Sequence, residues 1–201
     1  MRRIMLTALA LGSLVTLSAR GDIIIDFEAL KHVDANTNLI GKTYSEKGFT
    51  LTETGDNGFA TFGTLERRFS GSTALFDETA GGITTLVKDG GGSFNLKSID
   101  LAELNGNGAV SVTFTAVQNG GGTASQTFTT DGIAFGAETF AFSSAFGAIT
   151  SVSFVQLSPF SQFDNIRFGT LSAVPEPSSL AMLGIAAAAG LVAIRRRKRI
   201  A

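Results

Sequence analysis

Cysteine and tryptophan are absent from the 201-residue chain, and histidine and tyrosine occur only once each. Without cysteine the chain forms no disulfide and has neither a thiolate metal ligand nor a thiol nucleophile. The single histidine, His32, has no second histidine with which to share a metal ion and no nucleophile to activate, so we expect it to be solvated in a loop. These absences exclude thiol chemistry and the usual zinc and Ser-His sites.

Basic residues are scarce in the middle of the chain. Between Asp22 and Pro177, eight Lys and Arg residues stand against 17 Asp and Glu residues, a net charge of 8 − 17 = −9. Nucleic-acid binding needs a basic surface that displaces phosphate counterions. The sequence therefore predicts that nucleic acid is not a partner.

The first 21 residues have the three parts of a secretory signal peptide. An arginine pair gives the positive start, and residues 4–17 are mostly apolar. Ala19 and Gly21 place small residues at positions −3 and −1 before a cut ahead of Asp22. We expect the export translocon to carry the chain across the membrane and signal peptidase to remove residues 1–21.

An apolar run at residues 180–194 is followed at once by a basic cluster. As a helix, the run covers about 22 Å of the roughly 30 Å hydrocarbon core, so a span needs help from Ser178, Ser179 and snorkelling arginines. By the positive-inside rule, the cluster stays in the cytoplasm and the chain before it lies outside. We therefore expect a transmembrane helix at 180–194 and a cytoplasmic tail at 195–201. The basic residues are Arg195, Arg196, Arg197, Lys198 and Arg199.

Two prolines precede this run, in the segment Val174-Pro175-Glu176-Pro177. Proline fixes its own φ and disfavours helix at the residue before it, so the segment is extended, a shape that a membrane protease could recognise. The Pro-Glu-Pro segment, the apolar run and the arginine cluster, in this order, resemble the PEP-CTERM sorting signal of bacteria that contain an exosortase. The resemblance covers the C-terminal end of the chain only.

This resemblance implies that an exosortase, a multi-pass membrane cysteine protease, recognises the tail of a precursor anchored in the inner membrane. It further implies cleavage near the Pro-Glu-Pro segment and a product that is released or attached at the cell surface. Proteins with this tail are associated with bacteria that make extracellular polysaccharide and biofilm matrix. The alternative is a simple C-terminal membrane anchor with a proline-bearing linker.

Between the two ends, residues 22–171 have the pattern of about ten short strands, because apolar and polar residues alternate in many segments. Asn-Gly and Asp-Gly pairs such as Asp131-Gly132 favour tight turns between them. The pattern predicts an all-β, two-sheet β-sandwich that is jelly-roll-like, joined to the tail by a linker at 172–179. The expected strands are 23–28, 49–52, 74–76, 84–87, 94–96, 98–104, 110–115, 126–129, 138–142, 151–155 and 163–168.

Parts of this domain resemble the ectodomain of a group of exosortase-sorted proteins that looks like a carbohydrate-binding-module jelly roll. In similar jelly rolls a calcium ion joins the first strand to the last, which implies Glu28 and Asp164 as ligands here. The alternative is that Asp26, Glu28 and Asp164 cap turns or face water. The matching stretches are 26–28, 98–103, 110–114 and 162–166.

We expect a non-catalytic protein of the cell surface or extracellular matrix that binds extracellular polysaccharide. One alternative is a purely structural or adhesive component, and another is a secreted glycan-active hydrolase with paired carboxylates. A hydrolase would place two carboxylates about 5 to 10 Å apart in a cleft. A binding module would present an open face of polar and aromatic side chains, although only Tyr44 and the phenylalanines are available for stacking on sugars. The candidate carboxylates are Asp26, Glu28, Asp100, Glu103 and Asp164.

Overall fold

The structure is a computed structural model that describes residues 21–106 and 108–169. Within them the chain forms thirteen strands and two short 3-10 helices. The strands are β1 (Ile23–Ile25), β2 (Thr37–Gly41), β3 (Thr43–Glu46), β4 (Phe49–Glu53), β5 (Phe59–Phe62), β6 (Leu75–Asp77), β7 (Ile83–Lys88), β8 (Asn95–Glu103), β9 (Ser111–Gln118), β10 (Thr123–Thr129), β11 (Glu138–Ala141), β12 (Ile149–Val155) and β13 (Ser161–Gly169). The 3-10 helices are η1 (Glu28–Leu30) and η2 (Ser144–Phe146).

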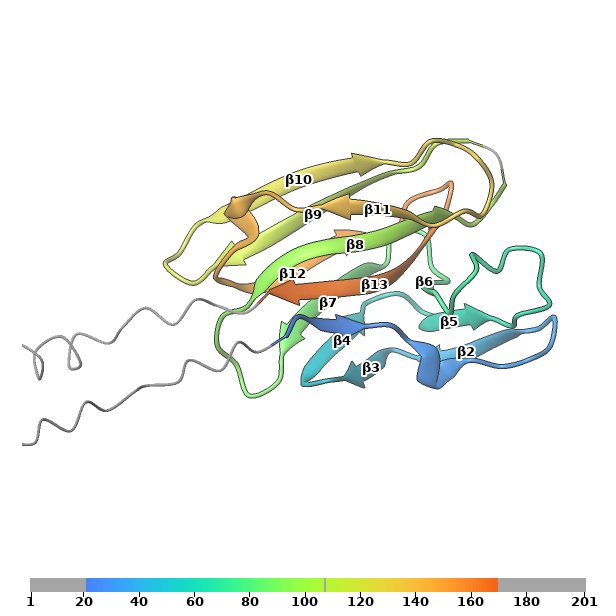
Figure 1. Cartoon of the computed structure of the whole chain (residues 1–201), viewed down its shortest axis with the longest axis horizontal. Helices are drawn as coiled ribbons and strands as arrows, with labels where there is room; N and C mark the ends of the chain where they lie inside the picture. The colour runs from blue at the N-terminus through green and yellow to red at the C-terminus, as the bar shows by residue number, and fades with distance from the viewer. Residues whose placement is uncertain (1–20, 107, 170–201) are drawn as a thin grey trace, which may run out of the picture.

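The strands make two antiparallel sheets. A seven-stranded sheet has the order β11-β8-β13-β6-β5-β2 with β1 beside β13, and a six-stranded sheet has the order β10-β9-β12-β7-β4-β3. In the view of Figure 1, β8 and β13 lie in front of β7 and β12. This arrangement confirms the predicted all-β sandwich.

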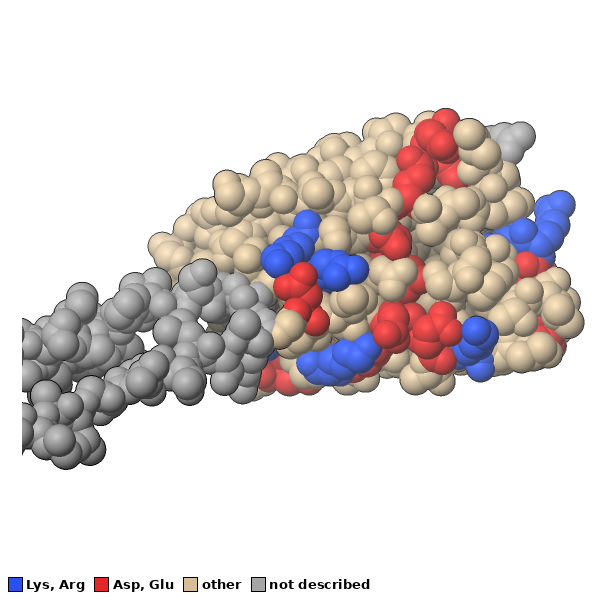
Figure 2. Space-filling view, viewed as in Figure 1, with Lys and Arg blue, Asp and Glu red and all other residues tan. Residues whose placement is uncertain are grey.

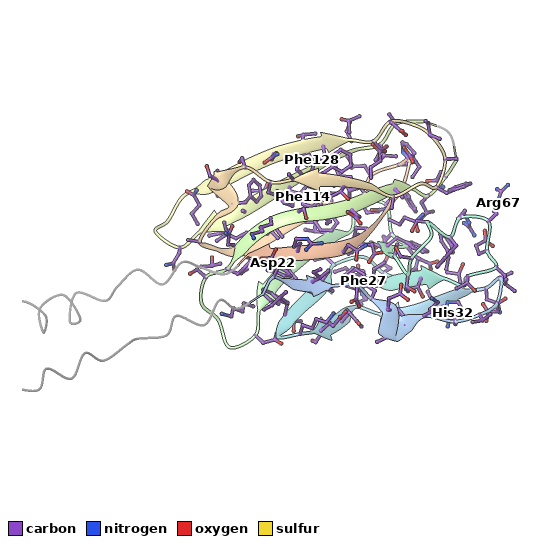
Figure 3. The ribbon with its side chains drawn as sticks, viewed as in Figure 1. Asp22, Phe27, His32, Arg67, Phe114 and Phe128 are labelled. Carbon is purple, nitrogen blue, oxygen red and sulfur yellow. The ribbon has the colours of Figure 1, made fainter. Side chains whose placement is uncertain are left out.

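Phenylalanine fills the space between the sheets. Phe27, Phe59, Phe114 and Phe163 are each 1% exposed or less. Aromatic rings favour edge-to-face and offset contacts, and the rings of Phe27 and Phe163 meet edge to face with centroids 5.8 Å apart. Figure 3 labels Phe114 on β9 and Phe128 on the neighbouring β10, whose ring centroids are 5.8 Å apart. Because the chain has no disulfides, burial of these rings is a main source of the domain's stability.

The last strand, β13, has two different neighbours along one edge. Near its start Phe163 pairs with Leu75 of β6, whereas its later residues pair with β1. Between these positions the ladder that β13 makes with β8 on its other edge is irregular after Asp164, and Asn165 takes a left-handed backbone with φ 45°. The last residue of β1 and the first residue of β6 therefore lie on either side of Asp164 along this edge.

Several element boundaries differ from the sequence prediction. The strand expected at 23–28 ends at Ile25, because Phe27 has a left-handed backbone (φ 50°) and Glu28 begins η1. The strands expected at 94–96 and 98–104 form the single strand β8. The prediction omitted β2, β3 and β5.

None of the helices in the described residues has the length and apolar character needed to cross a membrane. The expected transmembrane helix at 180–194 lies outside the described residues.

Candidate functional site: a hydroxyl face and an acidic junction

A row of hydroxyl side chains crosses the outer face of the six-stranded sheet. Each strand contributes one Ser or Thr, and the pairing register places them side by side from β10 to β3. Strands in a sheet are about 4.8 Å apart, so the row is about 24 Å long. We call it the hydroxyl row, and it consists of Ser125, Thr115, Ser153, Thr85, Thr52 and Thr43.

Some hydroxyls on this face are paired across neighbouring strands, mainly between β9 and β10. Thr115 Oγ1 lies 2.9 Å from Ser125 Oγ, and one step along the same strands Thr113 Oγ1 lies 2.8 Å from Thr127 Oγ1. A hydroxyl is one donor and two acceptors, so a paired hydroxyl keeps capacity for another partner. Each pair therefore fixes the orientation of its two side chains and leaves acceptor sites on both hydroxyls for a ligand.

The outward positions of these strands carry no charge, although Asp89, just after β7, accepts a hydrogen bond of 2.6 Å from Thr50 Oγ1 at the end of the face. The outward positions of β7, β9, β10 and β12 hold only Ser, Thr, Val and Ile, while the alternate positions are core residues such as Leu86 and Phe114. By contrast, Figure 2 shows acidic side chains as a band across the face on which β8 and β13 lie. The two faces of the sandwich therefore differ in chemistry.

No aromatic side chain in the described residues is fully exposed, although several are half-buried. The exposed large hydrophobic side chains there are aliphatic, for example Val117 on the outer face of β9. Tyr44 is half-buried against Phe27, with ring centroids 5.5 Å apart, and donates a hydrogen bond of 3.0 Å to Glu46 Oε2. The outer face of the six-stranded sheet therefore offers polar side chains, but none of its described residues is an exposed aromatic side chain on which a sugar could stack.

The predicted calcium ligands Glu28 and Asp164 lie on either side of one segment. Ser72 Oγ donates to Asp164 Oδ2, and the next residue, Thr73, donates its N–H to Glu28 Oε1 at 2.9 Å. Glu28 is exposed, whereas Asp164 is 1% exposed. Residues 72 and 73 thus connect Glu28, which lies in η1 just after the first strand, with Asp164 of the last strand at an acidic junction.

Burial raises the pKa of Asp164 to about 7. This value already includes the hydrogen bonds from Ser72 and Asn165, which lower the pKa, and the negative charges of Asp100 and Glu28, which raise it. A buried carboxylate of this kind is costly to ionise unless a cation is nearby.

The donors at this junction fit a calcium ion. They are carboxylate oxygens, which calcium prefers, and the buried Thr73 Oγ1 beside them has no hydrogen-bond partner in the described residues. The hydrogen bonds already made to Glu28 and Asp164 leave lone pairs free, because an ionised carboxylate has about four acceptor sites. Calcium binding itself remains a prediction.

The other carboxylates considered for hydrolysis are held in structural contacts. Asp26 accepts from Lys47 Nζ at 2.9 Å. Asp100 Oδ2 accepts from the side-chain amide of Asn165 at 2.9 Å, and the same amide lies 3.2 Å from Asp164 Oδ2. Glu103 is fully buried. None of these contacts resembles an acid and a base facing each other across a substrate.

His32 differs from the expectation of a solvated loop residue. Its Nδ1 lies 2.8 Å from Asp34 Oδ1 and its Nε2 lies 3.4 Å from Thr61 Oγ1. The side chain is only 14% exposed. The histidine is therefore a hydrogen-bonded structural residue.

The sequence did not predict a buried acidic pair on β4 and β6. Glu53 on β4 and Asp77 on β6 are 5% and 1% exposed, and each has one oxygen without a partner. Burial, together with the neighbouring Glu53, raises the pKa of Asp77 to about 6. Gly82 packs so closely on Asp77 that a Cβ at this position would lie 2.0 Å from its Oδ2.

Comparison with known proteins identifies the C-terminal signal. Residues 173–198 match the PEP-CTERM protein-sorting motif, which confirms the resemblance seen in the sequence. The motif implies an exported protein with a membrane-anchored precursor and processing by an exosortase. The predicted sorting residues Val174–Pro177, the signal-cleavage residue Ala19 and the basic cluster 195–199 lie outside the described residues.

Among solved structures, the domain is similar to carbohydrate-binding modules. A family 29 carbohydrate-binding module has 15% identity and a TM-score of 0.41, over 72% of this chain and 99% of the module. The family 11 module from Clostridium thermocellum, in complex with a β-1,3-1,4-mixed-linked tetrasaccharide, has 18% identity and a TM-score of 0.39, over 77% of this chain and 99% of that one. No curated protein matches the chain. At such identities and TM-scores the likeness assigns no ligand here.

Proposed function

We propose that the chain is an exported, non-catalytic protein of the cell surface or extracellular matrix, whose domain binds neutral polysaccharide through the hydroxyl row. The observation that carries this proposal is the alignment of one hydroxyl side chain from each strand of the six-stranded sheet. Its route through the cell follows from the two ends of the sequence.

The route begins with the translocon and with signal peptidase, which cuts between Gly21 and Asp22. The β-sandwich at 22–171 is then outside, held by the span at 180–194 and the basic tail at 195–201. Exosortase next cleaves in the linker 172–179 and frees the domain from the inner membrane. The PEP-CTERM motif at 173–198 supports this order of events.

The chemistry of the face matches a neutral glycan. Sugar hydroxyls are donors and acceptors, as are Ser and Thr hydroxyls, so each can bond to the other in place of water. Each such exchange contributes only about 0.5 to 1.5 kcal/mol, so useful affinity needs several contacts in a row. The row of about 24 Å is long enough for several sugar rings, and the absence of charge along its strands favours a neutral ligand.

The hydrolase alternative has weaker support. The carboxylates of Glu103, Asp131 and Glu138 converge within 4.8 Å, which is closer than the roughly 5 to 9.5 Å that glycosidases use. Glu103 is also fully buried, so no sugar reaches it. This geometry supports a non-catalytic role for the domain.

The Glu28 and Asp164 junction has a supporting role in this proposal. A calcium ion there would neutralise the buried Asp164 and clip the start of the domain to β13. It would stabilise an extracellular domain without disulfides, because a ligand that binds only the folded state favours that state.

The test is affinity electrophoresis of the processed protein in gels that contain neutral glucans or the host's own polysaccharide. A triple variant, Thr115→Val, Ser153→Ala and Thr85→Val, removes three central hydroxyls and keeps the side-chain shapes. We expect polysaccharide to retard the wild type and the triple variant to lose most of this retardation.

The matched control removes three hydroxyls away from this face, by Thr37→Val, Thr64→Val and Ser144→Ala, and should be retarded like the wild type. Equal retardation of the wild type and the row variant would remove the hydroxyl row as the site. A wild type that no neutral glycan retards would overturn polysaccharide binding itself.

A further inference from the structure

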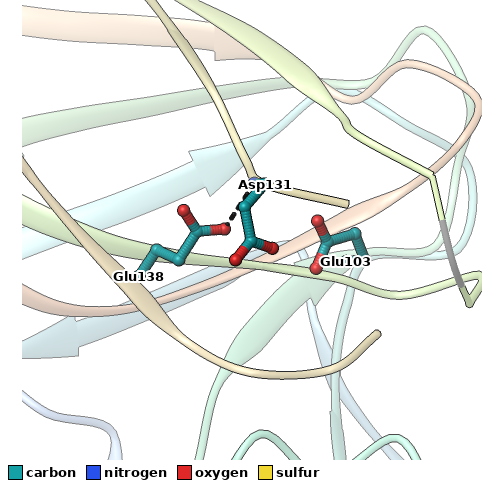
Figure 4. A group of neighbouring side chains, drawn as sticks. All are labelled: Glu103, Asp131 and Glu138. Carbon is teal, nitrogen blue, oxygen red and sulfur yellow. Dashed lines mark hydrogen bonds between the residues drawn. The ribbon is translucent and has the colours of Figure 1, made fainter. Parts of the chain in front are cut away.

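Three carboxylates converge at one end of the sandwich. Glu103 is the last residue of β8, Glu138 is the first residue of β11, and Asp131 lies in the loop between β10 and β11. One carboxylate oxygen from each residue lies within 4.8 Å of the oxygens that the other two offer. Figure 4 shows the side chains of Glu103 and Glu138 on either side of Asp131.

A tight turn builds this cluster. Gly132 has a φ of 83°, and a Cβ there would lie 3.0 Å from the backbone nitrogen of Ala109, so any other residue would be strained at this position. Its N–H donates to Glu103 Oε1 at 3.0 Å, and the N–H of Asp131 donates to Glu138 Oε1 at 2.8 Å. Consecutive backbone groups of the turn therefore hold two of the three carboxylates.

Glu103 is the buried member of the cluster, and one of its carboxylate oxygens lacks, among the described residues, the hydrogen-bond or ionic partner that a buried oxygen needs. Glu103 is 0% exposed, and its Oε2 makes no hydrogen bond in the described residues. None of the ion pairs formed by those residues includes Glu103, Asp131 or Glu138. A buried carboxylate oxygen without a partner is costly, and three like charges this close repel one another. A cation that bonds to Glu103 Oε2 would supply this missing partner and offset the repulsion.

We propose that Glu103, Asp131 and Glu138 bind a calcium ion that fastens the loop between β10 and β11 to the end of β8. The donors are all carboxylate oxygens, which select hard divalent cations over metals that prefer nitrogen or sulfur. Calcium accepts six to eight oxygens in irregular geometry, and the exposed Asp131 leaves room for water to complete the set. Because β10 belongs to one sheet and β8 to the other, the ion connects the two sheets.

The site is separate from the Glu28 and Asp164 junction, so the test needs a local readout as well as a count of ions. The full chain is purified in mild detergent, stripped with a chelator and dialysed against calcium. The variant is Asp131→Asn with Glu138→Gln, which keeps the buried Glu103 and therefore the packing of β8. We expect the variant to bind one calcium ion fewer per chain than the wild type.

The local readout is chymotrypsin cleavage after Phe135, which is half-buried in the loop. Calcium should protect this bond in the wild type, and the variant should lose that protection. The control, Asp56→Asn with Glu78→Gln, removes the same charges elsewhere and should keep both the ion and the protection. An unchanged ion count in the Asp131 and Glu138 variant, or protection that persists in it, would overturn the proposal.

Discussion

The ring of Phe49 on β4 stacks on the ring of Phe168 on β13, with centroids 3.9 Å apart and an angle of 11° between the planes. Phe94 meets both rings edge on, at 5.4 Å from Phe49 and 5.6 Å from Phe168. All three side chains are buried. Since β4 and β13 belong to different sheets, this aromatic group holds the sheets together at the end of the last strand.

Replacing Phe168 with alanine should therefore lower the free energy of unfolding by about 3 to 5 kcal/mol, the usual cost of emptying a buried aromatic position. Phe168→Leu should cost less because it refills part of the volume. Urea unfolding of the purified protein measures both. Leu65→Ala, at a side chain that is 69% exposed, is the control and should change stability little. A small loss for Phe168→Ala would mean that the two sheets do not depend on this contact.

The buried Asp77 should make stability fall as the pH rises. Its folded pKa of about 6, raised from 3.8 by burial and by Glu53, means that the folded state holds more protons than the unfolded state between these values. Linkage then lowers stability as the pH increases through this window, by up to about 3 kcal/mol. Thermal unfolding in chelator from pH 4 to 8 measures the trend.

Asp77→Asn separates this effect from other titrations. The amide does not ionise, so the variant should lose less stability than the wild type between pH 4 and 6 and should be the more stable of the two at pH 8. Asp56→Asn, at an exposed position, should follow the wild-type curve. Parallel curves for Asp77→Asn and the wild type would show that Asp77 titrates normally.

Alternation of apolar and polar residues predicted most of the strands because one face of each is buried. It failed for β5, whose four residues are all buried, and for β2, whose first three are all exposed. Neither pattern has a period of two. The sequence also contained no indication of the left-handed backbone at Phe27, because that conformation is uncommon for a bulky residue.

The sites depended on long-range pairing that a single sequence does not carry. Glu28 and Asp164 were implied by the resemblance to jelly rolls in which calcium joins the first strand to the last, and β1 does pair with β13. Ser and Thr alternate in β9 and β10, but only the register aligns them into a row across the sheet. Asp131-Gly132 was interpreted as a turn, and its contact with Glu103 arises from folding.

The substitution Asp164→Asn should raise the unfolding temperature without calcium and lower it, relative to the wild type, when calcium is present. Without calcium at pH 8, the wild type pays to ionise a buried carboxylate with a pKa of about 7, so the asparagine variant should unfold at a higher temperature. With calcium, the wild type should gain stability that the variant lacks, because an amide is a weaker ligand than a carboxylate. Calorimetry at pH 8 with and without calcium tests this. Calcium stabilisation of equal size in both proteins would place the ion elsewhere.

Replacement of Pro175, Glu176 and Pro177 by alanine should block the maturation of the precursor. The extended Pro-Glu-Pro segment lies in the matched sorting motif, and alanine removes both the fixed φ angles and the carboxylate. Intact-mass measurement on protein from the native envelope and medium should give a wild-type product that starts near Asp22 and ends near Pro177. The alanine variant should keep the C-terminal tail and remain in the membrane fraction.

Ser172→Ala is a suitable control for this experiment because it changes the linker just outside the matched residues. Its product should equal that of the wild type. If wild-type protein from the envelope retained Arg195–Arg199, exosortase would not be its protease. The chain would then be a β-sandwich on a permanent membrane anchor, and any polysaccharide that it binds would be held at the membrane rather than released with the matrix.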